Sequence, residues 1–388
     1  MNFDDNSLYN IKSSVDGKRY SLFELATWKN GLAFKKINFC ETGVPVIKIA
    51  ELNNGIGGTT AYTQQTFSED VHLCKGDLLF SWSGNPQTSI DIFRFNLDEG
   101  WLNQHIFKVT PDEKTVDRDY FYFLMKNLKP HFTQIATNKQ TTGLGHVTIA
   151  DIKRMSVIIP SLDVQRKIVS YIKPIDDKIE LNNEINNNLE QQVSALYQSW
   201  FEDFEITKGV CPENWSYQEL STIADIASGK RPPVKSNYCN EKTPISIVGA
   251  ASVMGYTSEA NHTDKILVTG RVGTHGVIQR FNTPCWTSDN TLVITSLYYE
   301  FTNQILHRID YSSMNRGSTQ PLITQGDMKK VVVLVPDEDT LAKFEEFASS
   351  LMAKWEANNN ENVKLASLRD TLLPKLMSGE LDVSDIEL

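Results

Sequence analysis

The chain of 388 residues contains no run of about 18 apolar residues, the length that a membrane-spanning helix requires. Its N-terminal segment is polar and carries Asp4, Asp5 and Asp16, so it does not resemble a signal peptide. We therefore expect a cytoplasmic protein without a membrane partner.

Cysteine is scarce and widely spaced, with five residues of which no two are closer than 28 positions. This spacing offers neither a local metal-binding knuckle nor an obvious disulfide framework, and it fits a reducing compartment. Because small apolar thiols usually pack in cores, we expect the five side chains to be buried and free. They are Cys40, Cys74, Cys211, Cys239 and Cys285.

The motifs of several enzyme classes are also missing. The Gly-Lys pair at 229–230 is followed by Arg231 rather than by a hydroxyl residue, which excludes a phosphate-binding loop of the Walker type. The Asn-Pro pair at 85–86 is followed by Gln87, so no Asn-Pro-Pro-aromatic motif of amino-methyltransferases is present. Zinc-hydrolase and serine-hydrolase motifs are absent, and the seven histidines are scattered. We expect neither a catalytic site nor a metal site.

The chain has a formal net charge of −10, so it has no overall positive charge that would attract nucleic acid. The charge is unevenly spread: residues 1–160 and 209–337 are each neutral, whereas residues 161–208 carry −4 and residues 338–388 carry −6. Each neutral segment can present a basic face while the acidic segments repel phosphate. The charge balance permits DNA binding but does not indicate it.

The sequence does contain an internal repeat with a shift of 176 residues. Residues 151–160 (DIKRMSVIIP) match residues 327–336 (DMKKVVVLVP). Each copy has a polar turn, a run rich in β-branched residues and a proline, which predicts a buried strand. Weaker matches relate residues 22–31 to 220–229 and residues 101–107 to 286–292.

After each of these prolines, apolar residues follow a 4-3-4-3 spacing that predicts a helix with a coiled-coil seam. Two helices of this kind can pair antiparallel and bury both seams. The first seam consists of Ile168, Ile172, Ile175, Ile179, Asn182, Asn186, Leu189, Val193, Leu196 and Trp200. The second consists of Phe344, Ala348, Leu351, Trp355, Asn358, Asn362, Leu365, Arg369, Leu372 and Leu376.

Two asparagines interrupt the middle of each seam. Buried amides weaken a coiled coil but fix its register, because misaligned pairing leaves them without partners. A solvated helix surface is the alternative for any one asparagine, although their recurrence at equivalent positions argues against it for the set. Pro174 and Pro374 lie within the predicted helices, where we expect kinks or segment starts. As a single helix, residues 164–201 would span about 57 Å.

These patterns predict an α+β protein with two tandem mixed α/β domains, residues 1–160 and 209–337. Residues 161–208 would form a central spacer helix and linker, and residues 338–388 a C-terminal spacer helix and acidic tail. Antiparallel pairing of the two helices as a coiled coil would give a pseudo-twofold molecule.

The helical segments resemble those of a known family. Residues 160–168 (PSLDVQRKI), 176–185 (DDKIELNNEI) and 199–204 (SWFEDF) are similar to the central conserved region of type I restriction–modification DNA specificity subunits. Residues 372–381 (LLPKLMSGEL) resemble the C-terminal signature of that family. The second copy departs from the pattern at residues 337–340 (DEDT) and at Arg369, which lies in the seam.

The resemblance implies a non-catalytic subunit of a host-defence complex. Each globular domain would be a target-recognition domain that reads one half of a split double-stranded DNA sequence, and the helices would set the gap between the halves. Two modification subunits would dock on the helices and methylate adenine with S-adenosylmethionine that they bind themselves, so no cofactor is expected in this chain. Restriction subunits would join where the system encodes them.

Candidate DNA contacts are polar and basic residues in loops rich in glycine, asparagine and threonine, where backbone can approach phosphate and long side chains can reach bases. Those of the first domain are Lys29, Asn30, Lys35, Lys36, Lys139, Gln140 and Thr141. Those of the second are Lys230, Arg231, Lys235, Arg271, Thr274, Arg316, Ser318, Thr319 and Gln320. The loops at 138–143 and 315–320 occupy comparable places in both copies and are the stronger candidates. For each residue taken singly, an ordinary solvated loop position is the alternative.

Trp200, Phe201 and Phe204 are the candidate anchors for a partner subunit, because aromatic residues dominate many interfaces. Trp200 also lies in the seam, where packing between helices is the simpler role; Phe201 and Phe204 lie off it. Two other functions are compatible with the sequence: a coiled-coil protein-interaction scaffold without nucleic-acid binding, and an enzyme with an unrecognised site. Salt-dependent binding to duplex DNA would argue against the scaffold.

Overall fold

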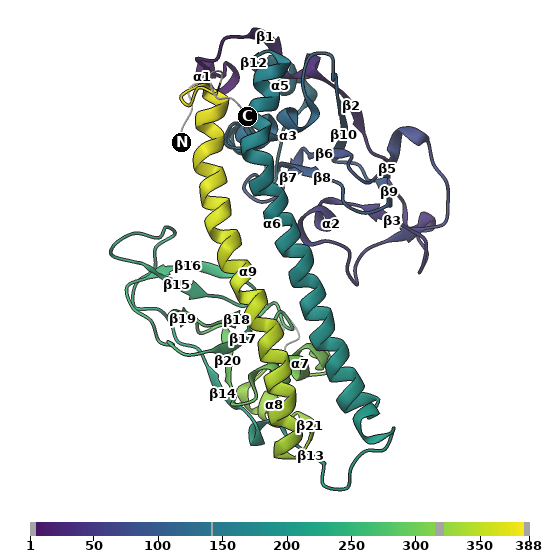
Figure 1. Ribbon diagram of the computed structural model, residues 1–388, viewed down its shortest axis with the longest axis vertical. Helices are drawn as coiled ribbons and strands as arrows, with labels where there is room; N and C mark the ends of the chain where they lie inside the picture. Colours follow the sequence, from purple (N-terminus) through teal and green to yellow (C-terminus); the bar gives the residue numbers. More distant parts are fainter. Residues whose placement is uncertain (1–4, 141–142, 315–321, 384–388) are drawn as a thin grey trace. The chain divides into compact units, whose positions relative to one another are not determined.

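The computed structural model describes residues 5–140, 143–314 and 322–383. They belong to two compact units, one made of residues 1–181 with 361–388 and one made of residues 182–360. Each unit contains its own sheets and one part of each of two long helices, α6 (Leu162–Tyr197) and α9 (Glu338–Ser378), as Figure 1 shows. The expected α+β class is confirmed, whereas the four sequential domain boundaries remain a prediction.

The first unit is built on an antiparallel sheet with the strand order β2-β10-β6-β8. Aromatic residues of the sheet and of two helices fill its core; the rings of Phe80 and Phe132 lie 4.9 Å apart. Asp117 caps the first of these helices by accepting hydrogen bonds from two backbone N–H groups. The elements are β2 (Ala26–Asn30), β6 (Leu78–Ser81), β8 (Asp91–Arg94), β10 (Ile106–Pro111), α3 (Arg118–Asn127) and α4 (Lys129–Asn138).

A second sheet in this unit has the order β4-β3-β9-β5 and a small core of its own, which includes Ile47 and Trp101. Its strands are β3 (Val44–Ile47), β4 (Tyr62–Thr63), β5 (His72–Cys74) and β9 (Glu99–Leu102), and α2 (Ile49–Asn54) follows β3. The remaining elements are α1 (Asp5–Tyr9), β1 (Lys18–Ser21), β7 (Ser83–Gly84), β11 (Gly145–His146), α5 (Ile149–Arg154), β12 (Ser156–Ile159) and the short 3₁₀ turns η1 (Leu22–Leu25), η2 (Lys36–Asn38) and η3 (Glu69–Val71).

The second unit repeats this plan with a sheet in the order β14-β20-β17-β18 and a smaller sheet β16-β15-β19. Phe301, Leu267 and Ile294 lie in the core between the large sheet and α7. The strands are β13 (Ser216–Glu219), β14 (Asp225–Ser228), β15 (Ile245–Val248), β16 (Val253–Thr257), β17 (Ile266–Gly270), β18 (Gln279–Phe281), β19 (Cys285–Thr287), β20 (Thr291–Thr295) and β21 (Val332–Val335). The helices are α7 (Tyr299–Arg308) and α8 (Gln325–Lys329), with turns η4 (Gln198–Glu202), η5 (Glu205–Thr207) and η6 (Leu220–Thr222).

The strongest sequence repeat corresponds to the same local structure in both units. Residues 151–160 contribute to α5 and β12, and residues 327–336 contribute to α8 and β21. Both helices begin with a capping box, in which the side chains of Thr148 and Asp151, or of Thr324 and Asp327, exchange hydrogen bonds with each other's backbone N–H. Each following strand pairs antiparallel with the strand that opens its unit's globular part, β12 with β1 and β21 with β13.

The segments related by the weaker sequence matches also have equivalent structures in the two units. Trp101 of β9 is paired in a parallel ladder with Val46, and Trp286 of β19 is paired in the same way with Ile247. Gly31 and Gly229 follow β2 and β14, and each backbone N–H donates to a carbonyl of the neighbouring strand region at 3.1 Å. A side chain at Gly31 would collide with the carbonyl of Asn103, and one at Gly229 with that of Ser288, so both sites require glycine.

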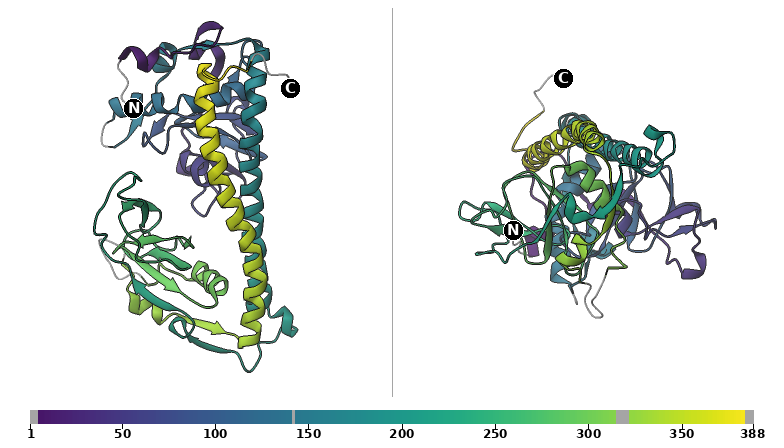
Figure 2. Two further views of the ribbon diagram at one scale, coloured as in Figure 1. Left: turned by 60° about the vertical axis from the view of Figure 1, so that its left-hand side comes forward. Right: turned by 90° about the horizontal axis from the view of Figure 1, so that it is seen from below.

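The long helices lie side by side within each unit (Figures 1 and 2). In the first unit, Ile168 and Ile172 of α6 share a core with Leu373 and Leu376 of α9. In the second unit, Val193 and Tyr197 pack with Phe344 and Ala348. Every described seam position is buried or partly buried, so the seam predicted from spacing is confirmed. Since α6 residues late in the chain contact α9 residues early in it, the helices run antiparallel; supercoiling and pseudo-twofold symmetry remain predictions.

Both prolines lie inside continuous helices rather than between separate ones. Pro174 and Pro374 are exposed, so water can reach the turn in which a backbone hydrogen bond is missing. Buried amides interrupt the seam as expected: Asn182, Asn186 and Asn358 are almost completely buried. In the part of the chain that the structure describes, no helix has the length and apolarity to span a membrane.

Candidate nucleic-acid interface

Four predicted DNA contacts of the first unit lie close together in sequence. They are at the end of β2 and in the loop that follows it. Lys29 forms an exposed ion pair with Asp70 at 3.1 Å, and Asn30 accepts a hydrogen bond from Trp82 Nε1 at 3.0 Å. Lys35 and Lys36 are both exposed, next to the short turn η2. The ammonium groups of Lys35 and Lys36 are therefore available to a ligand. That of Lys29 is held only by a weak surface ion pair, which a phosphate could replace.

Lys139 is committed to the structure of its own unit. Its Nζ lies 2.6 Å from both carboxylate oxygens of Asp151, which is almost completely buried. Burial alone would raise the pKa of Asp151, but hydrogen bonds from Lys139 and Thr148 hold that pKa below its ordinary value. Lys139 therefore neutralises a buried carboxylate at the start of α5, although its side chain remains 37% exposed, and its contact with DNA remains a prediction. Its neighbour Gln140 is exposed.

In the second unit, Lys230, Arg231 and Lys235 are exposed in the loop that follows β14. Arg231 lies 3.6 Å from Asp289 in a pair that is open to solvent. Arg271 and Thr274 follow β17; Arg271 is half-buried and its backbone bonds to Asn290 and Ile323, whereas Thr274 is exposed. The predicted residues thus fall in two separate loops of this unit.

Some predicted contacts lie outside the described residues. They are Thr141, Arg316, Ser318, Thr319 and Gln320. These belong to the two loops that were the stronger candidates, so the DNA-binding role of those loops remains a prediction.

The three aromatic candidates for partner binding have different surroundings. Trp200 is partly buried and packs edge-on against Phe344 and Phe347. Phe204 is partly buried against Trp215. Phe201 is only 4% exposed and is enclosed by aromatic rings of the second unit, so its expected exposure on the helix surface is wrong. The partner-binding role of the three residues remains a prediction.

Phe201 is buried because the helix changes its winding. Residues Gln198–Glu202 form a π-helical turn directly after α6, which adds residues to the turn and rotates those that follow. The rings of Phe301 and Phe344 consequently lie 5.0 and 5.2 Å from that of Phe201. A strict heptad pattern cannot anticipate this rotation.

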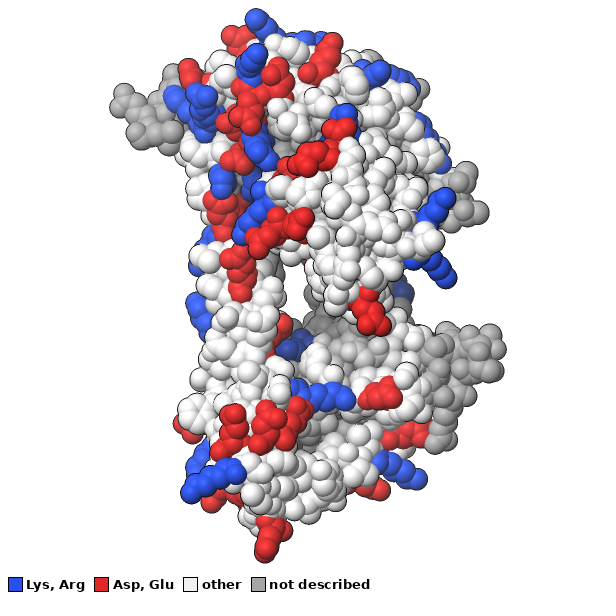
Figure 3. Space-filling model, turned by 90° about the vertical axis from the view of Figure 1, so that its right-hand side faces the viewer, with Lys and Arg blue, Asp and Glu red and all other residues white. Residues whose placement is uncertain are grey.

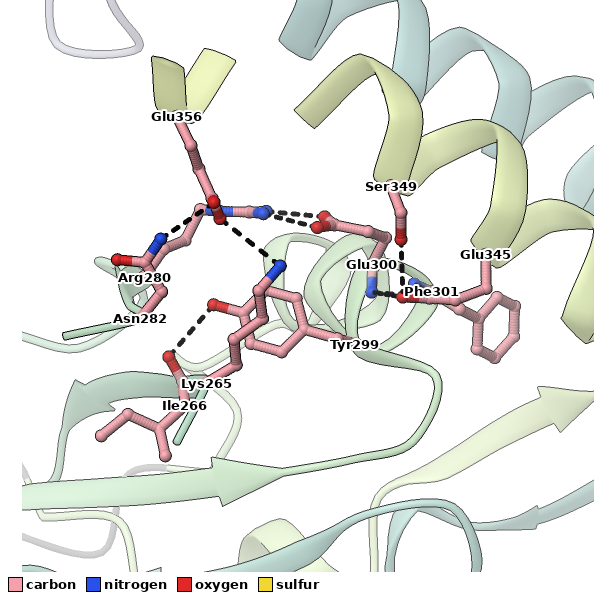
Figure 4. A network of polar contacts seen from close by, with 10 residues as sticks. All are labelled: Lys265, Ile266, Arg280, Asn282, Tyr299, Glu300, Phe301, Glu345, Ser349 and Glu356. Atoms are coloured by element: carbon pink, nitrogen blue, oxygen red, sulfur yellow. Dashed lines mark hydrogen bonds and ion pairs between the residues drawn. The ribbon is translucent and has the colours of Figure 1, made fainter. Parts of the chain in front are cut away.

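The globular part of the second unit is fastened to α9 by a polar network that sequence reasoning did not identify (Figure 4). Glu345 accepts hydrogen bonds from the backbone N–H groups of Glu300 and Phe301, and thereby caps α7, whose own N-cap residue provides no side-chain bond. Glu356 accepts from Asn282 at 2.9 Å and lies 3.6 Å from Lys265. These contacts fix the orientation of the sheet against its helix.

Both units use an arginine of the edge strand in the same way. Arg280 of β18 binds Glu300 with two hydrogen bonds of 2.6 and 2.7 Å, and Arg94 of β8 donates to Asp119 at 2.9 Å. Each carboxylate is the second residue of its helix, α7 or α3. Burial opposes the charge of Arg280, but Glu300 raises the pKa of the guanidinium above its ordinary value. These partly buried arginines join the edge strand to the following helix in each unit.

Acidic and basic side chains are intermixed along the helical edge in Figure 3, which fits a solvated surface better than a continuous phosphate track. The segments after Gly31 and Gly229 each contain exposed lysines, as several other described loops do. Among the described residues, no group of three or more histidine, cysteine, aspartate or glutamate side chains could hold a metal ion. Four cysteines are exposed and only Cys285 is buried, so the expectation of five buried thiols is wrong.

Comparison with known proteins finds similar sequences and structures of one kind. Residues 15–191 match the model of the type I restriction modification DNA specificity domain. The specificity subunit of type I restriction enzyme HindI from Haemophilus influenzae is 22% identical over 79% of this chain and 87% of its own length. That of MjaIX from Methanocaldococcus jannaschii is 24% identical over 73% of each chain. A crystal structure of a type I S subunit from M. genitalium shares the fold, with 16% identity, 94% and 97% coverage and a TM-score of 0.51. Residues 15–191 are thus similar to the type I restriction modification DNA specificity domain, as the helical motifs led us to expect.

Proposed function

We propose that this chain is the sequence-reading, non-catalytic subunit of a cytoplasmic type I restriction–modification complex. The observation that carries the proposal is the match of residues 15–191 to the specificity-domain family, together with a second unit that repeats the same strand order and the same helix caps. Two similar units in one chain suit a DNA target with two separate halves, because each unit can contact one half. Linking two weak readers also raises the overall affinity, because the second binding event becomes intramolecular.

The globular parts, residues 1–160 and 209–337, are the proposed readers of the two half-sites. The helical segments 161–208 and 338–388 set the spacing and bind two adenine methyltransferase subunits, which bring S-adenosylmethionine. Trp200 and Phe204 are the proposed aromatic contacts, with Phe201 supporting them from the core. A restriction subunit completes the complex where one is encoded.

Methylation mapping with the partner subunits tests this proposal. The chain is co-expressed with its methyltransferase, and modified adenines are mapped in genomic DNA from cells with and without the specificity gene. We expect one bipartite motif that disappears with the gene. Methylation that is unchanged by deletion would refute the proposal.

Binding to duplex DNA gives an independent test. The purified complex should bind a duplex with this motif at least about 10³-fold more tightly than a scrambled duplex, as specific DNA-binding proteins do. Its affinity should fall steeply with salt, because lysine and arginine contacts release counterions from phosphates. A coiled-coil scaffold would bind the methyltransferase without either property, and no structural observation favours that alternative.

A further inference from the structure

The loops after Gly31 and Gly229 occupy the same position in the two units. Residues 31–43 connect β2 of the large sheet to β3 of the small sheet, and residues 229–244 connect β14 to β15. Each loop leaves the sheet at a glycine that packs against backbone without room for a side chain. The two loops are therefore equivalent products of the internal repeat, although their sequences differ.

The first loop presents an isoleucine to solvent. Ile37 is 83% exposed and lies directly between Lys36 and Asn38. Asn38 fixes the local backbone, because its Oδ1 accepts from Lys35 N at 2.8 Å and its Nδ2 donates to Gln65 at 2.9 Å. A large apolar side chain is thus held outward on an ordered turn.

The second loop presents a tyrosine in a similar manner. Tyr238 is 79% exposed, yet its backbone carbonyl accepts hydrogen bonds from Ser236 Oγ at 2.7 Å, Asn240 Nδ2 at 3.3 Å and Thr243 Oγ1 at 3.3 Å. Ser236 itself is joined to Tyr256 by two backbone hydrogen bonds of 2.9 and 2.8 Å. The backbone is fixed while the ring stays free, an arrangement that reduces the entropy lost when the ring binds a partner.

The charged neighbours indicate the kind of partner. Lys35 and Lys36 directly precede the isoleucine, and Lys235 and Lys242 lie on either side of the tyrosine within four residues; all four are exposed. One exposed glutamate lies equally near in each loop, Glu41 and Glu241, so lysines outnumber acidic residues by two to one around each side chain. Lysine is depleted in protein–protein interfaces but is a common ligand of phosphate. An exposed apolar or aromatic side chain with two lysines close by therefore fits a polyanion with flat, stackable bases better than it fits a protein surface.

We propose that Ile37 and Tyr238 are the base-contacting side chains of these two loops, each placed against or between bases of one half-site while the neighbouring lysines bind the phosphates. This inference rests on the proposed function and assigns it two residues. Isoleucine acts as an apolar wedge that unstacks a base step, and tyrosine provides a ring on which a base can stack. Each half-site is contacted through one of the two residues.

The test uses the complete complex with its methyltransferase and a duplex of the mapped motif that carries the fluorescent base 2-aminopurine at successive positions of one half-site. Unstacking by a wedge or a ring increases the fluorescence of the base. Tyr238→Ala should remove this increase in one half-site only and weaken binding by about tenfold or more, whereas Tyr238→Phe should retain both. Ile37→Ala should act in the same way on the other half-site.

Matched controls separate this effect from general surface changes. Tyr217 is 73% exposed in the same unit but lies on β13, outside the loop, so Tyr217→Ala should bind as the wild type does. If the wild-type complex neither binds nor methylates a bipartite motif, the proposed function itself fails. If the wild type is active and Tyr238→Ala and Ile37→Ala match it in affinity and fluorescence, only this inference is overturned. Loss of methyltransferase assembly in either variant would show a protein contact instead, and would also overturn it.

Discussion

The side chain of Asn358 donates a hydrogen bond of 2.9 Å to Oδ1 of Asn186 at a position where both residues are almost completely buried. Asn186 in turn donates to Oδ1 of Asn359 at 3.0 Å. A buried amide pair in a largely apolar seam favours the register in which the two amides meet, because a buried amide opposite an apolar side chain lacks a hydrogen-bond partner. The pair therefore specifies how these parts of α6 and α9 meet.

Removal of one amide of this pair should be costly. Asn358→Ala leaves a buried acceptor of Asn186 without its donor, and we expect the free energy of unfolding to fall by about 1–3 kcal/mol. Denaturant titration of the purified chain measures the change. Asn187→Ala, which removes an exposed amide of α6 next to Asn186, is the control and should change stability by less than about 0.5 kcal/mol. Equal stability of the two variants would remove the structural role assigned to the pair.

Arg369 occupies a seam position that should be apolar, and its partner explains the departure. Its guanidinium donates to Asp176 at 2.9 Å, and Asp176 also lies 3.6 Å from Arg94 of β8. Burial opposes the charge, but the bonds to Asp176 and Asp370 raise the pKa of Arg369 above its ordinary value. One carboxylate thus connects the large sheet of the first unit to both of its helical segments.

Arg369→Met should destabilise the first unit, since it keeps the aliphatic stem but leaves Asp176 with one distant cation. We expect a loss of about 1–3 kcal/mol, less than for a fully buried pair because the guanidinium retains some solvent contact. Lys173→Met breaks the exposed pair with Asp177 on the same helix and should cost less than about 0.5 kcal/mol. Denaturation of both variants under identical conditions provides the comparison. A loss for Arg369→Met no larger than that for Lys173→Met would refute the role of this connection.

Much of the fold could be predicted from periodicity. The heptad spacing identified the seam, because an apolar residue every 3.5 positions has to be buried along one face of a helix. The shift of 176 residues identified the equivalent strands β12 and β21, because the same run of β-branched residues precedes Pro160 and Pro336. These are short-range properties that a sequence carries directly.

Properties that depend on distant partners could not be predicted in this way. The composition of a loop does not reveal that Lys139 turns inward to Asp151, nor that Arg369 meets Asp176. The heptad frame placed Phe201 at the surface because it assumes unbroken α-helical winding, which the π-helical turn changes. Ile37 and Tyr238 have no distinguishing sequence pattern, since an apolar residue in a loop cannot be told from a small core residue until its exposure is known.

The ion pair of Lys139 and Asp151 should make the stability of the first unit sensitive to acid. The pKa of Asp151 is lower in the folded than in the unfolded chain, so the unfolded chain binds more protons at acidic pH. The stabilisation is therefore complete above the ordinary aspartate range, near pH 4, and decreases as pH falls through the lowered pKa. Asp151→Asn should be less stable than the wild type at neutral pH, and the difference should shrink in acid. Denaturant midpoints measured between about pH 3 and 7 would show this convergence. Parallel curves would contradict the assignment.

Thiol reactivity should separate the cysteines by their burial. Cys40, Cys74, Cys211 and Cys239 are exposed, whereas Cys285 is buried, and burial raises the pKa of its thiol to about 11. Because the thiolate is the reactive form, a neutral aromatic disulfide reagent should modify four thiols in the native chain and the fifth only after unfolding. Mass spectrometry of peptides from native and denatured samples identifies the positions. Cys285→Ala is the control and should abolish the additional modification that appears on denaturation. Rapid modification of Cys285 in the native chain would show that the small core between β17 and β19 opens more readily than its packing indicates.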